Sequence, residues 1–237
     1  SLFAAWKEML ATAYVRIIII GAALPSGLFE SIAEKFGNIE RHNIPDCSIN
    51  EPTAETDAPK TVTERMPVTQ GKLVMGFSSR MHGDDGDSLP LMVMTDIFGG
   101  GPYSRLFANV REKMSLCYYC SARYTRLKSC ILVQCGCLEE NMDKAVNEIL
   151  HQLDVIKSGD YEEEFNSSRM ALVDAVGAVC DMPETIESWY IQQICDERYK
   201  TPQEVCDDIN NVKYDEIKEC ANLVSLDTVY KLVGQEE

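Results

Sequence analysis

Apolar residues recur along this chain with two spacings, one typical of amphipathic helices and the other typical of strands. Helical patterns predict helices over residues 2–13, 28–36, 89–98, 142–156, 160–179, 183–199 and 214–223, with a short one opened by Pro202. Alternating, aromatic or continuous β-branched runs predict strands over residues 15–21, 61–67, 72–78, 116–124, 130–137 and 228–234. The chain is therefore expected to form an α+β fold.

One long segment has no repeating apolar face. Residues 38–59 are polar and contain prolines at positions 45, 52 and 59, which is the composition of a linker. We place a domain boundary here, so that residues 1–59 and residues 60–237 belong to different structural units. The two ends of the chain also resemble each other, since each has a helix followed by a strand that ends in glycine.

The stretch from Gly99 to Tyr124 contains three successive signals. Gly99, Gly100 and Gly101 can adopt positive φ and permit close backbone approach, so they can end one helix and still leave an open loop. Pro102 has the fixed φ of a helix start. One face of the helix that follows is formed by Leu106, Phe107, Val110 and Met114.

A strand follows this helix. Its alternation predicts that one side is formed by Leu116, Tyr118, Cys120, Ala122 and Tyr124. Arg111, near the helix end, and Tyr118, near the strand start, are seven residues apart across a turn, so both tips can reach one point. A guanidinium and a phenol there would both donate hydrogen bonds to a carbonyl oxygen. The alternative is a helix-end salt bridge for Arg111 and packing within the sheet for Tyr118.

The same stretch resembles a known family of peptidases. The resemblance is carried by Gly99-Gly100-Gly101, Ser104-Arg105-Leu106-Phe107, Val110-Arg111-Glu112-Lys113 and Leu116-Cys117-Tyr118. These motifs are similar to the C-terminal domain of the pitrilysin, insulysin and mitochondrial processing peptidase superfamily, the inverzincin metallopeptidases. The similarity extends more loosely over nearly the whole chain. It is greatest to the two-domain bacterial members, some of which work as pairs of unequal subunits.

The resemblance implies both a fold and a role. The fold would be a mixed, largely antiparallel sheet with helices packed on one face. Residues 1–59 would close a preceding homologous domain and include the linker, and residues 60–237 would form the complete second domain. Arg111 and Tyr118 would donate hydrogen bonds to the peptide carbonyl at a zinc ion held elsewhere. The corresponding glycine loop, formed here by Gly99, Gly100 and Gly101, would touch the substrate.

The zinc motif of that family, His-x-x-Glu-His, is absent from this sequence. The chain has 3 histidines, His42, His82 and His151, and none has a second histidine within a helical turn. We therefore expect no metal ligands and no cofactor in this chain, and zinc in the complete enzyme or in a partner subunit. The chain alone is expected not to hydrolyse peptides.

Three interpretations of function remain open from the sequence. The chain is the second domain of a zinc endopeptidase whose motif lies upstream, or part of a non-catalytic subunit that lends Arg111 and Tyr118 to a zinc-bearing partner, or a structural core subunit without a proteolytic role. The presence of both Arg111 and Tyr118 argues against a structural core subunit. The sequence around these two residues favours the non-catalytic subunit. The expected partners are a peptide or unfolded polypeptide and a zinc-bearing N-terminal domain or homologous catalytic subunit.

Composition limits which classes of partner and which cellular location we expect. The net charge of −16, without any Lys/Arg-rich run, leaves no source of phosphate neutralisation, so a nucleic-acid partner is not expected. The longest aliphatic run, residues 17–20, is far too short to cross a membrane. No signal peptide is seen, so we expect reduced cysteines and a cytoplasmic location. Strand spacing would point Cys117 and Cys120 to opposite faces, and we interpret both as structural thiols.

Overall fold

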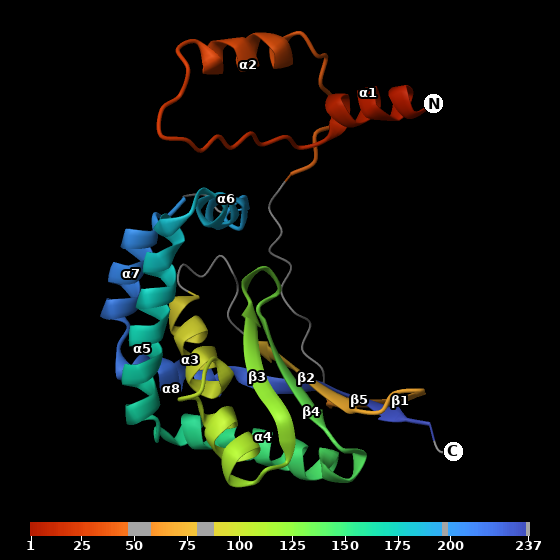
Figure 1. The fold of residues 1–237 in the computed structure, drawn as a ribbon, viewed down its shortest axis with the longest axis vertical. Coiled ribbons are helices and arrows are strands. Elements are labelled where there is room, and N and C mark those ends of the chain that lie inside the picture. Colours follow the sequence, from red (N-terminus) through yellow and green to blue (C-terminus); the bar gives the residue numbers. More distant parts are fainter. Residues whose placement is uncertain (47–57, 80–87, 196–198, 236–237) are drawn as a thin grey trace. The chain divides into compact units, whose positions relative to one another are not determined.

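The computed structural model describes residues 1–46, 58–79, 88–195 and 199–235 of the chain (Figure 1). The chain forms two compact units. One consists of Ser1–Ile49 and Gly177–Pro202, and the other consists of Asn50–Val176 and Gln203–Glu237. The second unit contains the sheet and every residue that the sequence predicts to belong to the site.

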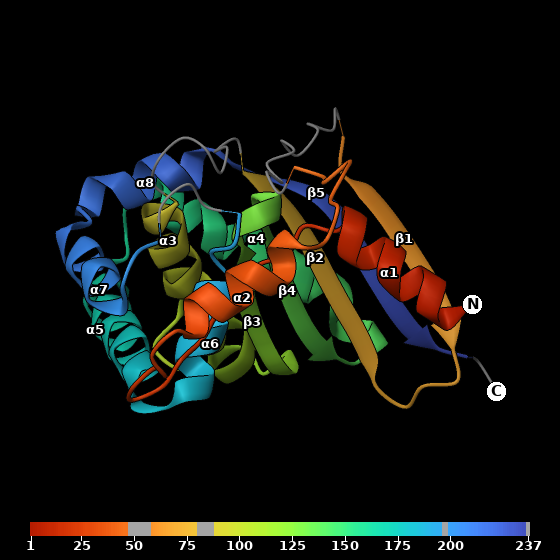
Figure 2. The same ribbon diagram turned by 90° about the horizontal axis from the view of Figure 1, so that it is seen from above.

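A five-stranded sheet forms the centre of the second unit. Its strands are β1 (Lys60–Met66), β2 (Gly71–Ser79), β3 (Cys117–Thr125), β4 (Cys130–Cys137) and β5 (Val224–Gly234). Seen from above, they lie side by side in the order β1-β5-β2-β4-β3 (Figure 2). Strands β1 and β5 pair in parallel, and the other three pairs are antiparallel. The prediction of a mixed, largely antiparallel sheet is confirmed.

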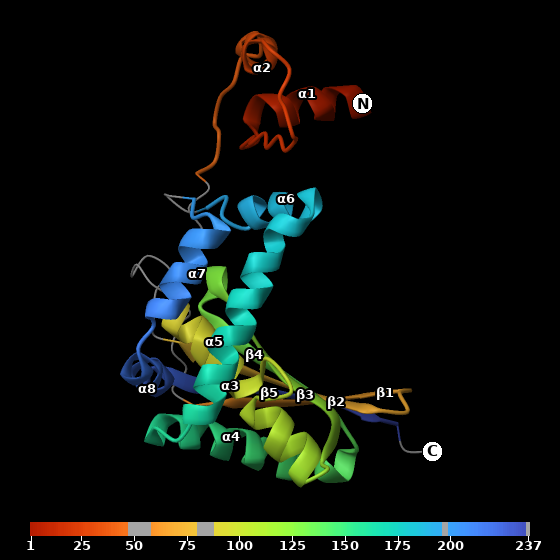
Figure 3. The ribbon, with the colours of Figure 1, turned by 60° about the vertical axis from the view of Figure 1, so that its left-hand side comes forward.

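Helices cover one face of this sheet. They are α3 (Leu89–Gly99), η1 (Leu106–Lys113), α4 (Met142–Ser158) and α8 (Tyr214–Asn222), with short turns η2 (Arg126–Lys128) and η3 (Glu139–Asn141). Helix α5 (Glu162–Gly177) packs on α3 and α8, and α7 (Pro202–Asn211) packs on α5. Alternate residues of β2 are buried, among them Leu73, Met75 and Phe77, while Lys72 is exposed. In Figure 3 α4 runs along one side of the sheet. Phe98 of α3 and Met142 of α4 both meet the buried side of β2, at Phe77 and Gly71, so the prediction of helices on one face is confirmed. No helix in the described part of the chain is long and apolar enough to cross a membrane.

Aromatic contacts fix the helices to the sheet and to each other. Phe77 of β2 meets Phe98 of α3 edge to face, with ring centroids 6.1 Å apart. Tyr161, at the start of α5, is fully buried and stacks on Tyr214 of α8 at 4.3 Å. Its hydroxyl donates a hydrogen bond to the Tyr214 carbonyl at 2.7 Å. These contacts pack α3 closely against the sheet and α5 against α8.

The first unit is helical. It contains α1 (Leu2–Thr12), α2 (Leu28–Gly37), η4 (Ala178–Asp181) and α6 (Pro183–Ile191). The helices predicted over residues 2–13 and 28–36 are confirmed, but the helix predicted over residues 183–199 already ends at Ile191.

The strand predicted over residues 15–21 is wrong, because these residues form no strand. A β-branched run becomes a strand only where another strand pairs with its backbone. The first unit contains no such strand among its described residues.

The position of the domain boundary stays a prediction. Residues 38–46 of the predicted linker contain no helix or strand, and residues 47–57 lie outside the described residues. The contacts of the chain group residues 177–202 with the first unit. A boundary between residues 59 and 60, and the homology of the two domains, are therefore still proposals.

Candidate functional site

The helix that carries Arg111 is a π-helix, whereas the apolar spacing predicts an α-helix. At the end of η1 the Met114 N–H donates to the Asn109 carbonyl at 3.1 Å, five residues back. Leu106 and Val110 are fully buried as predicted, but Met114 is exposed, so its assignment to their face is wrong. The wider turn of a π-helix moves later residues off an α-helical stripe. Such segments are rare and occur frequently at functional sites.

The three glycines before η1 make room for neighbouring atoms. A Cβ on Gly99 would lie 2.5 Å from the backbone N and 2.8 Å from the Cβ of Ala122 on β3. A Cβ on Gly100 would overlap the Asp96 side chain at 1.8 Å, and one on Gly101 would lie 2.8 Å from a nearby tyrosine ring. None of the three has a positive φ, so close approach rather than backbone reversal requires glycine here. Contact of Gly99, Gly100 and Gly101 with substrate stays a prediction.

A half-buried acid holds the glycine loop in place. The Asp96 carboxylate, in the last turn of α3, accepts hydrogen bonds from the Tyr103 hydroxyl at 2.6 Å and the Ser168 hydroxyl at 2.5 Å. Burial raises the pKa of Asp96, although both hydrogen bonds favour its charged form. The motifs of the sequence do not predict a role for this group. The signal was present, because Asp96 is an acid within a mostly apolar helix.

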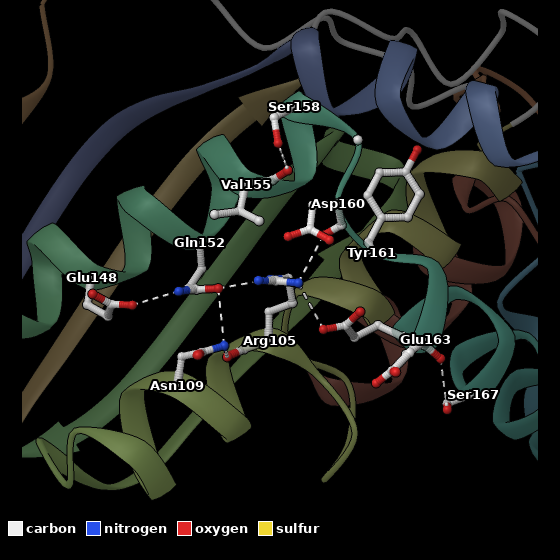
Figure 4. A network of polar contacts seen from close by, with 12 residues as sticks. Arg105, Asn109, Glu148, Gln152, Val155, Ser158, Asp160, Tyr161, Glu163 and Ser167 are labelled. Atoms are coloured by element: carbon white, nitrogen blue, oxygen red, sulfur yellow. Dashed lines mark hydrogen bonds and ion pairs between the residues drawn. The ribbon is translucent and has the colours of Figure 1, made fainter.

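Arg105 anchors the start of η1 to two other elements (Figure 4). Its Nε donates to Gln152 Oε1 on α4, and its Nη1 donates to the Asp160 carbonyl and to Glu164 Oε1, each at 2.9 Å. The Arg105 and Glu164 side chains are 13% and 19% exposed, so water screens their ion pair poorly. Asn109, one turn further on, donates to the same Gln152 oxygen at 3.2 Å. These contacts set the orientation of η1 against α4 and α5.

We expect Arg105→Ala to lower the free energy of unfolding by roughly 3 kcal/mol, because it leaves the largely buried Glu164 carboxylate without its partner. Chemical denaturation measures this loss. Glu139→Gln is the matched control, since it breaks the Arg65–Glu139 pair, whose side chains are 45% and 53% exposed. That change should cost less than about 1 kcal/mol. Equal losses in the two variants would contradict the anchoring role of Arg105.

Arg111 lies in the last turn of η1 with its side chain 41% exposed. Its guanidinium carbon lies 4.6 Å from the centroid of the Phe107 ring, and its Nε lies 3.6 Å from a Glu112 carboxylate oxygen. The helix-end salt bridge considered from the sequence is therefore present. An exposed ion pair of this length contributes little stability, and it engages one nitrogen of a group with five N–H donors.

Tyr118 lies on a β-bulge at the start of β3. The pairing with β4 shifts between Cys117 and Tyr119, so Tyr118 is an extra residue on its strand. Its side chain is 61% exposed, whereas Cys120 is buried. The prediction that Tyr118 shares the face of Cys120 is therefore wrong, because the bulge interrupts the alternation on which it was based. The alternative that Tyr118 packs within the sheet does not fit its exposure.

The structure brings Arg111 and Tyr118 to the same end of the hairpin formed by β3 and β4. Tyr118 follows Cys117 in the chain. Hydrogen bonds with Cys120 and Cys135 are the main causes of the lowered pKa of the Cys117 thiol, and the nearby Arg111 guanidinium lowers it further. Both candidate donors are thus at least partly open to solvent near one thiol. That their tips meet at one carbonyl oxygen stays a prediction.

The residues present do not fit the catalytic zinc of the family. Of the three histidines, His82 lies outside the described residues. His42 and His151 are exposed, and neither has a second histidine within a helical turn, as the family's motif requires. Among the described residues, three metal-ligating side chains lie close together, and all three are thiols: Cys117, Cys120 and Cys135.

Comparison with known proteins identifies the family. The profile of the family described as peptidase M16 inactive domain matches residues 1–172. The chain belongs to this family. The resemblance inferred from the glycine, Arg-Glu-Lys and Leu-x-Tyr motifs is thus confirmed.

Relatives of this M16 inactive domain support the assignment. A probable inactive metalloprotease of Bacillus subtilis, YmfF, is 32% identical over 179 residues, which are 75% of this chain and 42% of that protein. A conserved protein from Enterococcus faecalis has a TM-score of 0.87 at 27% identity, over 100% of this chain and 56% of that chain. The peptidase M16 inactive domain from Pseudomonas fluorescens shares the fold, with a TM-score of 0.69 at 15% identity, over 90% of this chain and 52% of that chain. This chain therefore spans about half the length of such relatives.

Proposed function

We propose that this M16 inactive domain is the substrate-binding part of a zinc-dependent peptidase assembly and belongs to its non-catalytic subunit. In this proposal Arg111 and Tyr118 donate hydrogen bonds to the carbonyl oxygen of the peptide bond that is cut. Gly99, Gly100 and Gly101 lie along the path of the peptide. The zinc ion belongs to another domain or to a homologous catalytic subunit.

One observation supports the proposal most strongly. Arg111 and Tyr118 are both open to solvent, and they lie on two irregular elements that contact each other, the π-helix η1 and the bulge of β3. A β-bulge turns Tyr118 out of the sheet, and Arg111 lies at the exposed end of a π-helix. Bulges next to active sites re-aim side chains, and π-helical turns are frequent at functional sites. A guanidinium and a phenol donate to an oxygen that gains negative charge, and such donors stabilise the transition state of acyl transfer.

A further observation favours a partner subunit over an autonomous protease. A relative with 32% identity carries the description of a probable inactive metalloprotease. The alternatives are an autonomous endopeptidase with His-x-x-Glu-His upstream, and a structural core subunit. Hydrolysis of an unfolded peptide by the full-length protein alone would support the autonomous enzyme. The expected cytoplasmic location, without a nucleic-acid or membrane partner, also stays a prediction.

The test is Tyr118→Phe in the full-length protein assembled with its zinc-bearing partner. Loss of one neutral donor at the carbonyl should lower kcat/KM for an unfolded peptide by roughly tenfold. Tyr119→Phe is the matched control, because Tyr119 follows Tyr118 on the same strand and packs its ring against Gly136. It should leave turnover unchanged. Full activity of Tyr118→Phe, or equal loss in both variants, would contradict the proposed role.

A further inference from the structure

Four cysteines lie together at one end of the β3–β4 hairpin, and we call them the thiol cluster. The Sγ atoms of Cys117, Cys120 and Cys135 all lie within 4.8 Å of one another. Cys137 lies two residues beyond Cys135 on β4, pairs with Cys117 in the register of the hairpin, and is hydrogen-bonded to the Cys135 thiol. Cys120 pairs with Cys135 in the same register. All four side chains therefore share one face of the hairpin.

The bulge at Tyr118 creates this cluster. In a regular strand Cys117 and Cys120 would point to opposite faces, and on that ground the sequence favours structural thiols over a metal site. The extra residue returns Cys117 to the face of Cys120. The predicted opposite orientation is wrong, so the reason for excluding a metal site no longer holds.

We propose that Cys117, Cys120, Cys135 and Cys137 bind a zinc ion through their four thiolate sulfurs. Zinc in structural sites is tetrahedral with Zn–S distances of about 2.3 Å, which place the sulfurs roughly 3.8 Å apart. The Sγ atoms of Cys117, Cys120 and Cys135, all within 4.8 Å of one another, need only a small contraction to reach this geometry. The Cys137 thiol, which is hydrogen-bonded to Cys135, would have to move closer to the other two sulfurs to complete the site. Four sulfur ligands leave no open position, so the site would be structural and distinct from the family's catalytic zinc.

The surroundings fit a closed thiolate site with a route of entry. Cys120, Cys135 and Cys137 are buried, while Cys117 is half-buried and gives an ion access from the surface. The Arg111 guanidinium interacts electrostatically with Cys117 and would offset part of the negative charge that four thiolates leave around a divalent ion. Ligands on both strands, on either side of the bulge, would hold the bulge in its observed register.

Cobalt(II) is the probe that tests the site, because tetrahedral thiolate coordination gives it a strong sulfur-to-metal charge-transfer band and intense ligand-field bands. The full-length protein is reduced, stripped of metal with a chelator and titrated anaerobically with cobalt. We expect these bands to saturate at one equivalent and to disappear when zinc is added. Zinc should also raise the thermal midpoint of the stripped protein.

Cysteine variants decide which thiols take part. Cys120→Ser and Cys135→Ser should weaken the charge-transfer band, whose intensity rises with the number of thiolate ligands, and lower zinc affinity by more than the roughly 10- to 100-fold typical of an outer-shell change. Cys130→Ser is the matched control, since Cys130 lies on the same strand at its other end and should leave binding intact. Circular dichroism of each stripped variant shows whether the fold is retained. Cys117→Ala gives a second test that does not depend on the buried thiols, because Cys117 is half-buried.

Three results would overturn the proposal. One is the absence of a cobalt charge-transfer band in the reduced wild-type protein. Another is a band of wild-type intensity, with unchanged zinc affinity, in a folded Cys120→Ser or Cys135→Ser variant. The third is a disulfide within the thiol cluster, found by mass spectrometry of the purified protein, together with no zinc binding after reduction.

Discussion

Replacing Arg111 with alanine should lower kcat/KM for a peptide substrate by about 100- to 1,000-fold in the assembled enzyme, the usual loss when one oxyanion donor is removed. The guanidinium would lie where negative charge develops, in a chamber from which water is largely excluded, so no solvent molecule replaces its hydrogen bonds. Arg111→Lys should recover little of this loss, because an ammonium lacks the planar fork of donors. Steady-state kinetics with an unfolded peptide measure the effect.

A matched control separates this effect from a change in folding. Lys113 lies on the same π-helix and is exposed, so Lys113→Ala removes a nearby positive charge without removing the proposed donor. We expect its kcat/KM to be unchanged. The Arg111→Ala protein should keep its midpoint of unfolding, because its ion pair with Glu112 is exposed. Normal turnover by folded Arg111→Ala would refute the assigned role.

The second large effect concerns stability. Gly99→Val should lower the free energy of unfolding by more than about 3 kcal/mol, because overpacking at a site without free space forces the backbone to move. At this position even a Cβ atom would lie 2.5 Å from the backbone N of Ala122, so α3 would have to separate from β3. Denaturation midpoints and the yield of soluble protein measure the loss.

A milder substitution and a control at another glycine test whether the loss comes from the close packing at Gly99. Gly99→Ala introduces only the first clashing atom, and it should still be clearly less stable than the wild type. At Gly177 a Cβ would meet nothing within 4 Å and φ is −58°, so alanine is accommodated there. Gly177→Ala should therefore raise stability by about 0.4–1 kcal/mol. Wild-type stability of Gly99→Ala would show that the close packing of α3 on β3 is not required.

Much of the fold follows from local pattern. Strand β2 is predicted correctly because alternate residues, such as Leu73 and Met75, are buried against the helices. This alternation is visible in the sequence. Helix α4 ends at Gly159, whose φ of 98° is a standard helix stop. The run over residues 15–21 shows the limit, because strand formation there depends on a pairing partner that its own residues do not specify.

The two irregular elements of the candidate site could not be predicted in this way. Both the π-helix and the bulge accommodate one residue more than the regular element, and residues distant in sequence decide where that happens. Arg105 binds Gln152 and Glu164 on other helices, and the bulge follows from the pairing of β3 with β4. The sequence therefore locates Arg111 on its helix but mispredicts the surroundings of Tyr118.

The central claim is that Arg111 and Tyr118 act together on one carbonyl oxygen, and a double-mutant cycle tests it most directly. The kcat/KM of Arg111→Ala, Tyr118→Phe and the double variant is measured in the assembled enzyme with one unfolded peptide. Two donors to the same oxygen should be coupled, so the double variant should lose at least about threefold less activity than the product of the two single losses. Losses that multiply independently, or single variants that retain full activity, would contradict the account.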